Sequence, residues 1–246
     1  MIGPKMALPL EALRLIQIGL QRMNCESQTV LSLGYPDILA SAEQLAELFG
    51  AQLLPAFQFR DDSAQIARWH GLPDSARIVE AVNFFALLGY DLEVLDVLEA
   101  RGGEMVHDLN EPVPASLHRR YALVIDPGTL EHCFNIAQAA KNLAEMVAPG
   151  GWVFHGNPMS MFNHGFYNLN PTWYHDFYAA NGFKVELVEG VVNPVREPQR
   201  FEVPPTGRFG GVPPESSLYV LARRERETPM RWPTQTKYLK NPTLKS

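Results

Sequence analysis

The sequence alternates short apolar segments with amphipathic segments, and this alternation restricts the fold more than any other feature of the chain. The short apolar segments, which are typical of strands, lie at residues 29–33, 91–97, 104–109, 121–126 and 152–156. Segments with apolar residues at helical spacing lie at residues 9–23, 41–49, 76–88 and 132–147. Strands that alternate with helices form a mainly parallel sheet covered by helices on both faces.

The C-terminal part of the chain departs from this alternation. A helix is predicted over residues 171–181, and strands follow at 183–190 and 217–224 with only a Pro/Gly-rich loop, 190–216, between them. Two strands with no crossover helix between them pair antiparallel. The sequence therefore predicts an α/β fold with a mainly parallel seven-stranded sheet, an antiparallel C-terminal strand and helices on both faces.

The charge distribution suggests how the chain is divided. We expect a single domain over residues 1–224, in which the polar segment 55–75 forms an insertion or lid, and a basic tail over residues 225–246. The stretch from Arg223 to Ser246 carries seven Lys/Arg and two Asp/Glu, whereas the net charge of the whole chain is −6. Such a tail lies in solvent, binds an anionic partner or folds back on its own acidic domain. The acidic whole gives no indication of a nucleic-acid partner.

Two cysteines, Cys25 and Cys133, allow at most one disulfide, and no secretory leader is evident. No run reaches the ~18 apolar residues that a membrane-spanning helix needs. We therefore expect a cytoplasmic protein with reduced thiols and no membrane partner. A homodimer remains open.

Candidate ligand-binding residues lie where the predicted strands end, because open α/β sheets bind ligands at the carboxyl ends of their strands. Asp96 ends one strand and, with Val97 beside it, is placed to accept hydrogen bonds from ribose hydroxyls. Asp108 ends the next strand and could accept from an adenine amino group while Leu109 packs on the ring. The alternatives are a solvated loop carboxylate for Asp96 and a turn cap for Asp108.

The segment "IDPGTLEH" (125–132) ends another strand at Asp126 and turns through Gly128. Glu131 and His132 are predicted to open the long helix that follows. A helix N-terminus favours the negative Glu131 and disfavours a charged imidazole, so His132 would be neutral and able to act as a general base. The alternative is that both residues are merely exposed in the first turn.

The next segment, "HGNPMSMFNHGFYNLNPTWYHDFY" (155–178), combines histidines with aromatic residues. Its candidate pocket residues are His155, His164, Tyr167 and Trp173, which would shape a substrate cavity. His132, His155 and His164 could also converge with Glu131 and Asp126 on a metal ion. Their spacing matches no compact ligand motif, so no metal is predicted.

These segments resemble a known family. "YALVIDPGTLEHCFNIAQAAKNLAEMVAPGGWVFHGNP" resembles the motif IV to motif VI region of class I S-adenosylmethionine-dependent methyltransferases, and the similarity extends over roughly residues 76–190. "LEVLD" and "HDLNEPVP" resemble the strand ends that contact ribose and adenine there. "HGFY…P…FY…NGF" resembles a subgroup of uncharacterised bacterial methyltransferase-like proteins. The resemblance implies the Rossmann-like class I methyltransferase fold and S-adenosyl-L-methionine as cofactor.

One segment departs from the family. After its first strand the family has a pattern such as "DxGxGxG", whereas this chain has "SLGYPD". Gly34 would still let the backbone approach the cofactor, with Tyr35 beside it, but Pro36 offers no N–H. The methionine end of the cofactor would then need other partners, for instance from the 55–75 segment.

Three functions follow. The first is O- or N-methylation of a small-molecule or sugar acceptor, with His132 as base and His164 as the second candidate; Glu131 is the third predicted catalytic residue. The second is a methyltransferase-like binding or scaffold subunit that transfers no methyl group. The third is a metal-assisted enzyme that uses the cluster of His132, His155 and His164. An NAD-dependent dehydrogenase is not predicted because the phosphate-binding fingerprint is absent.

Overall fold

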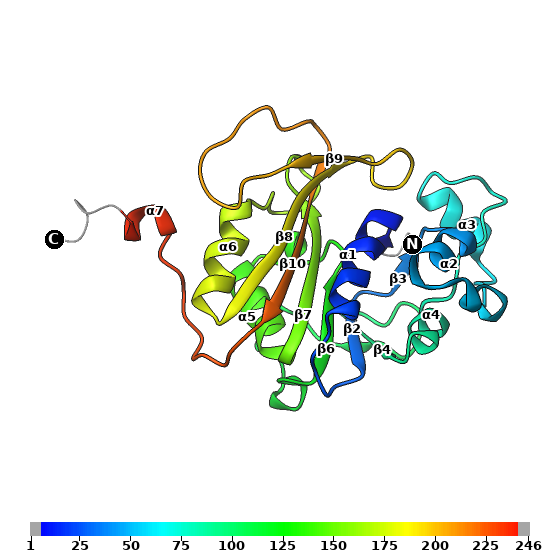
Figure 1. The fold of residues 1–246 in the computed structure, drawn as a ribbon, viewed down its shortest axis with the longest axis horizontal. Coiled ribbons are helices and arrows are strands. Elements are labelled where there is room, and N and C mark those ends of the chain that lie inside the picture. The colour runs from blue at the N-terminus through cyan, green and yellow to red at the C-terminus, as the bar shows by residue number, and fades with distance from the viewer. Residues whose placement is uncertain (1–5, 241–246) are drawn as a thin grey trace.

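The computed structural model describes residues 6–240. Residues 1–5 of the predicted domain and 241–246 of the predicted tail lie outside the described residues. The main sheet has the strand order β5-β4-β2-β6-β7-β10-β8-β9 (Figure 1). Its strands are β2 (Thr29–Leu33), β4 (Asp91–Asp96), β5 (Met105–Val106), β6 (Tyr121–Asp126), β7 (Val147–Pro158), β8 (Phe183–Val192), β9 (Gln199–Glu202) and β10 (Ser216–Arg224).

The pairing of these strands confirms the predicted fold class. The strands from β5 to β7 pair parallel, and β10 lies between β7 and β8 and runs antiparallel to both. This arrangement is the Rossmann-like sheet of the class I methyltransferase fold. The short strand β9, which the sequence analysis took as part of a loop, pairs antiparallel with β8 and adds an eighth strand at the edge.

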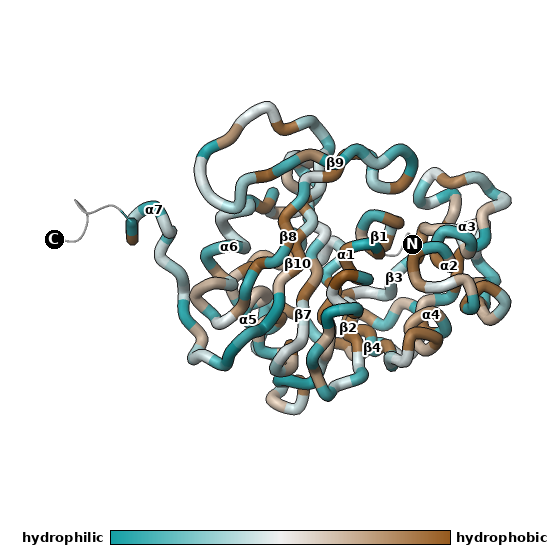
Figure 2. Tube along the Cα trace, viewed as in Figure 1, coloured by the Kyte–Doolittle hydropathy of each residue, from teal (hydrophilic) through white to brown (hydrophobic). Residues whose placement is uncertain are grey.

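Helices cover both faces of the sheet. On one face lie α1 (Leu10–Gln21), α2 (Ala42–Phe49) and α4 (Ala81–Leu87), and on the other lie α5 (Ile136–Met146) and α6 (Pro171–Ala180). The alternation along β6 divides the core, since Leu123 and Ile125 pack with the first group and Val124 with the second. In Figure 2 apolar segments gather along the central strands and on α1 and α4.

A small second sheet was not predicted. Strand β1 (Met6–Leu8) pairs parallel with β3 (Pro36–Ile38), with Met6 opposite Pro36 and Leu8 opposite Ile38. The segment that replaces the family's glycine-rich loop is therefore a short strand, held by the N-terminal part of the chain.

Two predicted helices begin later than expected. The helix predicted from residue 132 begins at Ile136, where the side chain of Asn135 accepts from the Gln138 amide and caps it. Glu131 and His132 lie before it, in the separate 3₁₀ turn η3 (Leu130–His132). The argument that the dipole of a long helix keeps His132 neutral was therefore wrong. Similarly, α4 begins at Ala81 after a cap by Glu80.

The predicted insertion and tail both contain short helical segments. Residues 55–75 include the end of η1 (Ala51–Ala56) and α3 (Ser63–Trp69), whose Ile66 is fully buried. The described part of the tail runs to α7 (Thr236–Leu239) and is bound to α6, since Asp176 accepts from the Thr236 amide at 2.9 Å. A further short turn is η2 (Ala115–Leu117). Within residues 6–240 no helix is long and apolar enough to cross a membrane.

Candidate functional site

A cavity of about 730 Å³ lies at the carboxyl ends of the parallel strands. Its walls come from Gly34 after β2, from residues 95–98 of β4 and the loop after it, from residues 107–110 after β5, and from residues 127–133 after β6. The N-terminal segment contributes Met6, Ala7, Pro9 and Ala12 to the same walls. A cavity of this size and position suits a nucleoside-containing ligand, because the strand ends of an open α/β sheet converge there.

One side of the cavity contains Asp96, the last residue of β4. Its Oδ1 accepts from the Val97 amide at 2.6 Å, and burial raises the pKa of Asp96. Val97 and Leu98 beside it line the cavity and are 62% and 50% exposed, so two apolar side chains stand open to a ligand at this point. This side therefore combines a carboxylate with an apolar surface, which suits a ribose and its base.

Asp108 and Leu109 line the cavity next to Asp96. The Oδ1 of Asp108 accepts from both the amide and the side-chain nitrogen of Asn110, at 2.9 and 2.7 Å. In turn, the side-chain oxygen of Asn110 accepts from the Asn135 amide at 2.7 Å. Asp108 thus caps a turn that ties the end of β5 to the start of α5, as the alternative interpretation of the sequence had it, while it still faces the cavity.

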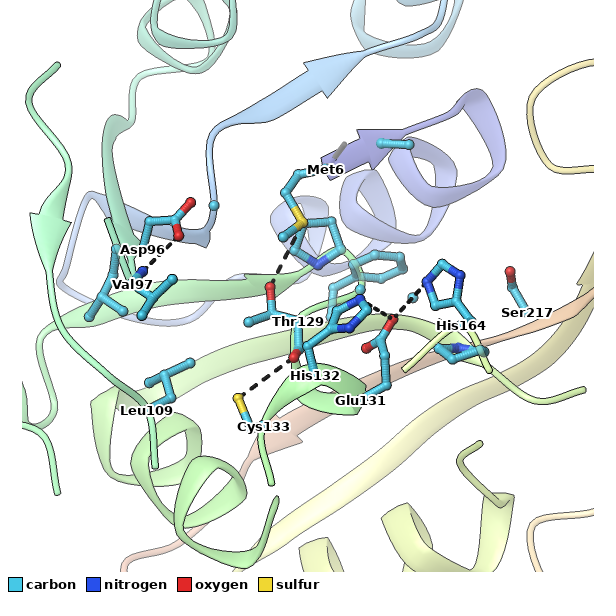
Figure 3. A pocket seen from close by; sticks show the side chains of 18 of the residues that line it. Met6, Asp96, Val97, Leu109, Thr129, Glu131, His132, Cys133, His164 and Ser217 are labelled. Atoms are coloured by element: carbon cyan, nitrogen blue, oxygen red, sulfur yellow. Dashed lines mark hydrogen bonds and ion pairs between the residues drawn. The ribbon is translucent and has the colours of Figure 1, made fainter. Parts of the chain in front are cut away.

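Gly34 lines the cavity in a left-handed backbone conformation, with φ of 81°. A Cβ placed there would lie 2.5 Å from Cγ of Met6, so the Met6 side chain rests directly on this glycine. Figure 3 shows the Met6 sulfur between Asp96 and Glu131, close to Thr129. Met6 therefore occupies the close approach that Gly34 makes available.

The rest of this loop faces away from the cavity. Tyr35 donates a hydrogen bond to Glu80, and its ring lies 5.1 Å from the guanidinium groups of both Arg60 and Arg101. Asp37 is fully buried and binds Arg101 and His70. The prediction that Tyr35 lines the cofactor site is wrong, because its hydroxyl and ring are occupied within the protein.

On the other side of the cavity, Glu131 lies between His132 and His164 (Figure 3). Its Oε1 is 3.9 Å from Nε2 of His132 and 3.6 Å from Nε2 of His164. Glu131 is 1% exposed, and this oxygen has no hydrogen-bond partner among the described residues. The Glu131 carboxylate raises the pKa of His164, against the smaller effect of burial. A carboxylate oxygen without a partner and two imidazoles thus face one point of the cavity.

The second oxygen of Glu131 is held by a buried hydrogen-bond network. Its Oε2 accepts from the side-chain nitrogen of Asn157 at 2.9 Å, and the same nitrogen donates to Asp126 at 2.9 Å. Tyr174 donates to the side-chain oxygen of Asn157. Burial raises the pKa of Tyr174 well above its usual range, so its hydroxyl stays protonated and serves as a donor. Asn157, which the sequence analysis did not single out, therefore sets the orientation of Glu131.

His155 belongs to this buried network and does not line the cavity. Its Nδ1 lies 2.7 Å from Asp126, and its Nε2 lies 2.5 Å from the Tyr178 hydroxyl. Burial alone would raise the pKa of Asp126, but donation from His155 and from the Thr129 amide outweighs it and lowers the pKa. An ionised Asp126 accepts from Nδ1 of His155, and both ring nitrogens of His155 are thereby engaged within the buried network. The prediction that His155 shapes the substrate pocket is therefore wrong.

Nine of the predicted cofactor and catalytic residues line the cavity: Gly34, Asp96, Val97, Asp108, Leu109, Gly128, Glu131, His132 and His164. Four of the remaining predicted residues lie behind or beside it. Asp126 and His155 are fully buried below the site, Tyr167 donates to the Phe134 carbonyl at 2.8 Å, and Trp173 lines a separate cavity on α6. No residue of the 55–75 segment lines the main cavity, so the methionine end of a cofactor would not reach that segment.

The strand order defines the class of fold. Solved structures of similar fold were found by comparison with known proteins. The chain is similar to a structure solved in work on the conversion of a disulfide bond into a thioacetal group during echinomycin biosynthesis (14% identity, 89% of this chain, 82% of that chain, TM-score 0.41). It is similar to TehB from Haemophilus influenzae (12% identity, 86% of this chain, 61% of that chain, TM-score 0.43). It is also similar to the 16S rRNA (adenine(1408)-N(1))-methyltransferase from Catenulisporales acidiphilia (13% identity, 90% of this chain, 95% of that chain, TM-score 0.39). No protein-family model and no curated protein matches the sequence.

Proposed function

We propose that this protein transfers a methyl group from S-adenosyl-L-methionine to a small-molecule acceptor, at oxygen or nitrogen. The observation that carries the proposal is the cavity at the carboxyl ends of the parallel strands with Asp96 at the tip of β4. The cavity is large enough for a nucleoside-containing cofactor and an acceptor together. When bound, the cofactor supplies an activated methyl group on a sulfonium.

The residues present fit the nucleoside half of this cofactor better than its methionine half. Asp96 would hold the ribose hydroxyls, and Val97, Leu98 and Leu109 would cover the base. Around Gly34 the methionine half would meet the Met6 side chain, which is flexible and able to move aside. The described lining contains no Lys or Arg for its carboxylate. We expect the nucleoside half to provide most of the affinity.

The protein's own residues would position the acceptor and take its proton. His132 would act as the base, and Glu131, oriented by Asn157, would hold the acceptor group beside it. The 3.9 Å between Glu131 Oε1 and His132 Nε2 leaves room for an acceptor atom that contacts both. Closure of the cavity around the donor and acceptor would exclude water from the transfer.

Calorimetric titration with S-adenosylhomocysteine tests the proposal. We expect binding by the wild type and a loss of affinity of about tenfold or more for Asp96→Ala, because two charge-assisted hydrogen bonds disappear. Asp91→Ala is the matched control, since Asp91 is exposed and lies at the opposite end of the same strand. Absence of binding by the wild type would refute the proposal, and equal affinities of the two variants would remove Asp96 from the site.

A second candidate function is metal-assisted catalysis, and the unpartnered Oε1 of Glu131 favours it. This oxygen and one nitrogen each from His132 and His164 all lie within 4.8 Å of one another. One carboxylate and two imidazoles suit zinc or a similar divalent transition metal. His155 cannot join them, because both of its nitrogens are engaged with Asp126 and Tyr178. Metal analysis of the purified protein and of Glu131→Gln tests this candidate, and metal retained equally by both would refute it.

A further inference from the structure

We propose that the acceptor is an amine that carries an aryl or alkyl group, bound with its nitrogen at Oε1 of Glu131. This inference rests on the proposed methyl transfer and names its substrate class. Three features carry it: the charge of the cavity lining, the unpartnered oxygen of Glu131 and an exposed aromatic pair that the backbone of Glu131 holds just outside that lining.

The described lining of the cavity is acidic. It contains the carboxylates of Asp96, Asp108 and Glu131 together with three histidines, and none of its described residues is Lys or Arg. A carboxylic acid or phosphate acceptor would enter this cavity against like charge and without a cationic partner. A cationic acceptor would enter with favourable electrostatics.

Within this acidic cavity, Oε1 of Glu131 is the position where a cationic group would bind. Its side chain is 1% exposed, and only Oε2 is hydrogen-bonded, to Asn157. A buried carboxylate oxygen without a donor is costly, so a ligand that supplies both an N–H and a positive charge gains more there than a neutral hydroxyl. Nε2 of His164 and Nε2 of His132 lie 3.6 and 3.9 Å from this oxygen, beyond hydrogen-bond distance, so the oxygen is left for the N–H of a ligand.

Two phenylalanines next to Glu131 supply the apolar surface. Phe134 is 71% exposed and Phe166 is 64% exposed, and their rings meet edge to face with centroids 5.4 Å apart. The Phe166 amide donates to the Glu131 carbonyl at 2.8 Å, and Gly165 allows this approach, since a Cβ there would lie 2.7 Å from the same carbonyl oxygen. The chain thus holds two exposed aromatic rings close to the backbone of Glu131, at the outside of the cavity, where an aryl or alkyl group that extends from the bound nitrogen would meet them.

The transfer balances with groups present in the site. The bound ammonium gives one proton to His132 and becomes a neutral amine with a free electron pair. That pair forms a bond to the methyl carbon as the carbon–sulfur bond breaks, and the bonding electrons return to sulfur. The products are a methylated ammonium, the neutral thioether of the spent cofactor and one proton on His132.

A matched series of probes tests the substrate class. The full-length protein saturated with S-adenosylhomocysteine is titrated calorimetrically, with EDTA present, against 2-phenylethylamine, 2-phenylethanol and 3-phenylpropionate. We expect the amine to bind at least about tenfold more tightly than the alcohol, and the acid not to bind. Glu131→Gln should remove the difference between amine and alcohol, because the neutral side chain no longer distinguishes them.

Variants of the aromatic pair test the apolar part. Phe134→Ala and Phe166→Ala should weaken the amine and the alcohol alike, whereas Phe209→Ala, in the separate cavity on α6, should change neither. If the protein binds S-adenosylhomocysteine but prefers the alcohol or the acid, the amine assignment is wrong and the methyl transfer stands. If S-adenosylhomocysteine does not bind, the proposed function itself fails. With the real cofactor and 2-phenylethylamine, mass spectrometry should detect the N-methyl product.

Discussion

The turns that follow β2 and β6 form an instructive pair. The two strands are neighbours in the sheet, and each is followed by a glycine with positive φ, Gly34 at 81° and Gly128 at 108°. A buried carboxylate follows each glycine, Asp37 in β3 at 0% and Glu131 in η3 at 1% exposure. The two carboxylates differ in whether both of their oxygens have partners.

Asp37 is satisfied within the protein. Its Oδ1 accepts from Arg101 at 2.9 Å, and its Oδ2 lies 3.0 Å from Nε2 of His70. Glu131 has one oxygen on Asn157 and one that faces the cavity without a partner. Buried polar groups in folded proteins are nearly always paired, so an unpaired one that faces a cavity indicates ligand binding more strongly than burial or charge alone. The carboxylate that follows β2 is therefore bound within the protein, whereas the carboxylate that follows β6 has one oxygen available to a ligand.

The largest effect that separates the two turns is on stability. Asp37→Ala should destabilise the protein by about 3–5 kcal/mol, because it leaves Arg101 as a largely buried cation without its counter-charge and Nε2 of His70 without its hydrogen-bond partner. Chemical denaturation monitored by circular dichroism measures this loss.

Glu131→Gln is the control for that experiment. It should change the free energy of unfolding by less than about 1 kcal/mol, because the glutamine still accepts from Asn157 and no buried charge is left unpaired. Equal destabilisation by the two substitutions would show that Glu131 is as structural as Asp37 and would contradict the comparison.

The sequence predicted the turn after β6 better than the segment after β2. Periodicity placed β2, β4 and β6, and the rule that ligands bind at strand ends then brought Asp96 and Glu131 to one cavity. These inferences need only local patterns and sheet topology. The pairing of β1 with β3 and the contact of Met6 with Gly34 could not be predicted, because three residues before Pro9 carry no periodic pattern and their partner lies about thirty positions away.

The buried hydrogen-bond network under Glu131 could not be predicted from the sequence for a related reason. Asn157 and Tyr174 come from a strand and a helix that meet only in the folded chain, and His155 looks the same in sequence whether it faces a cavity or Asp126. The start of α5 was misplaced because the cap at Asn135 lies three residues beyond His132, in a segment whose helical spacing is continuous. The histidine and the asparagine could be assigned only once their hydrogen-bond partners were known.

An intermediate effect tests whether the Met6 side chain fills the space over Gly34. Gly34→Ala should cost about 1–2 kcal/mol for its positive φ, with a further loss from the clash with Met6. Gly89→Ala is the matched control, since Gly89 has φ of 85° with nothing within 4 Å of an added Cβ. Thermal unfolding of both variants measures the difference. In a Met6→Ala background the two glycines should cost the same, and a gap that persists there would mean that Met6 is not what fills the space.

The smallest effect is a pH dependence on the side of Glu131. The pKa of His164 is raised by the Glu131 carboxylate, so the imidazolium stabilises the folded state fully below the unfolded value of 6.5, and the contribution disappears as the pH rises through the folded pKa. The stability difference between wild type and His164→Ala should therefore be larger at about pH 6 than at about pH 9. His164 is 47% exposed, so solvent screening keeps the effect well below that of Asp37→Ala. Denaturant titrations at both pH values measure it, and in Glu131→Gln most of this pH dependence should be lost, because Glu131 raises the pKa of His164 more than Glu215 does. An undiminished dependence in this variant would place the main partner of His164 elsewhere and weaken the contrast between the two turns.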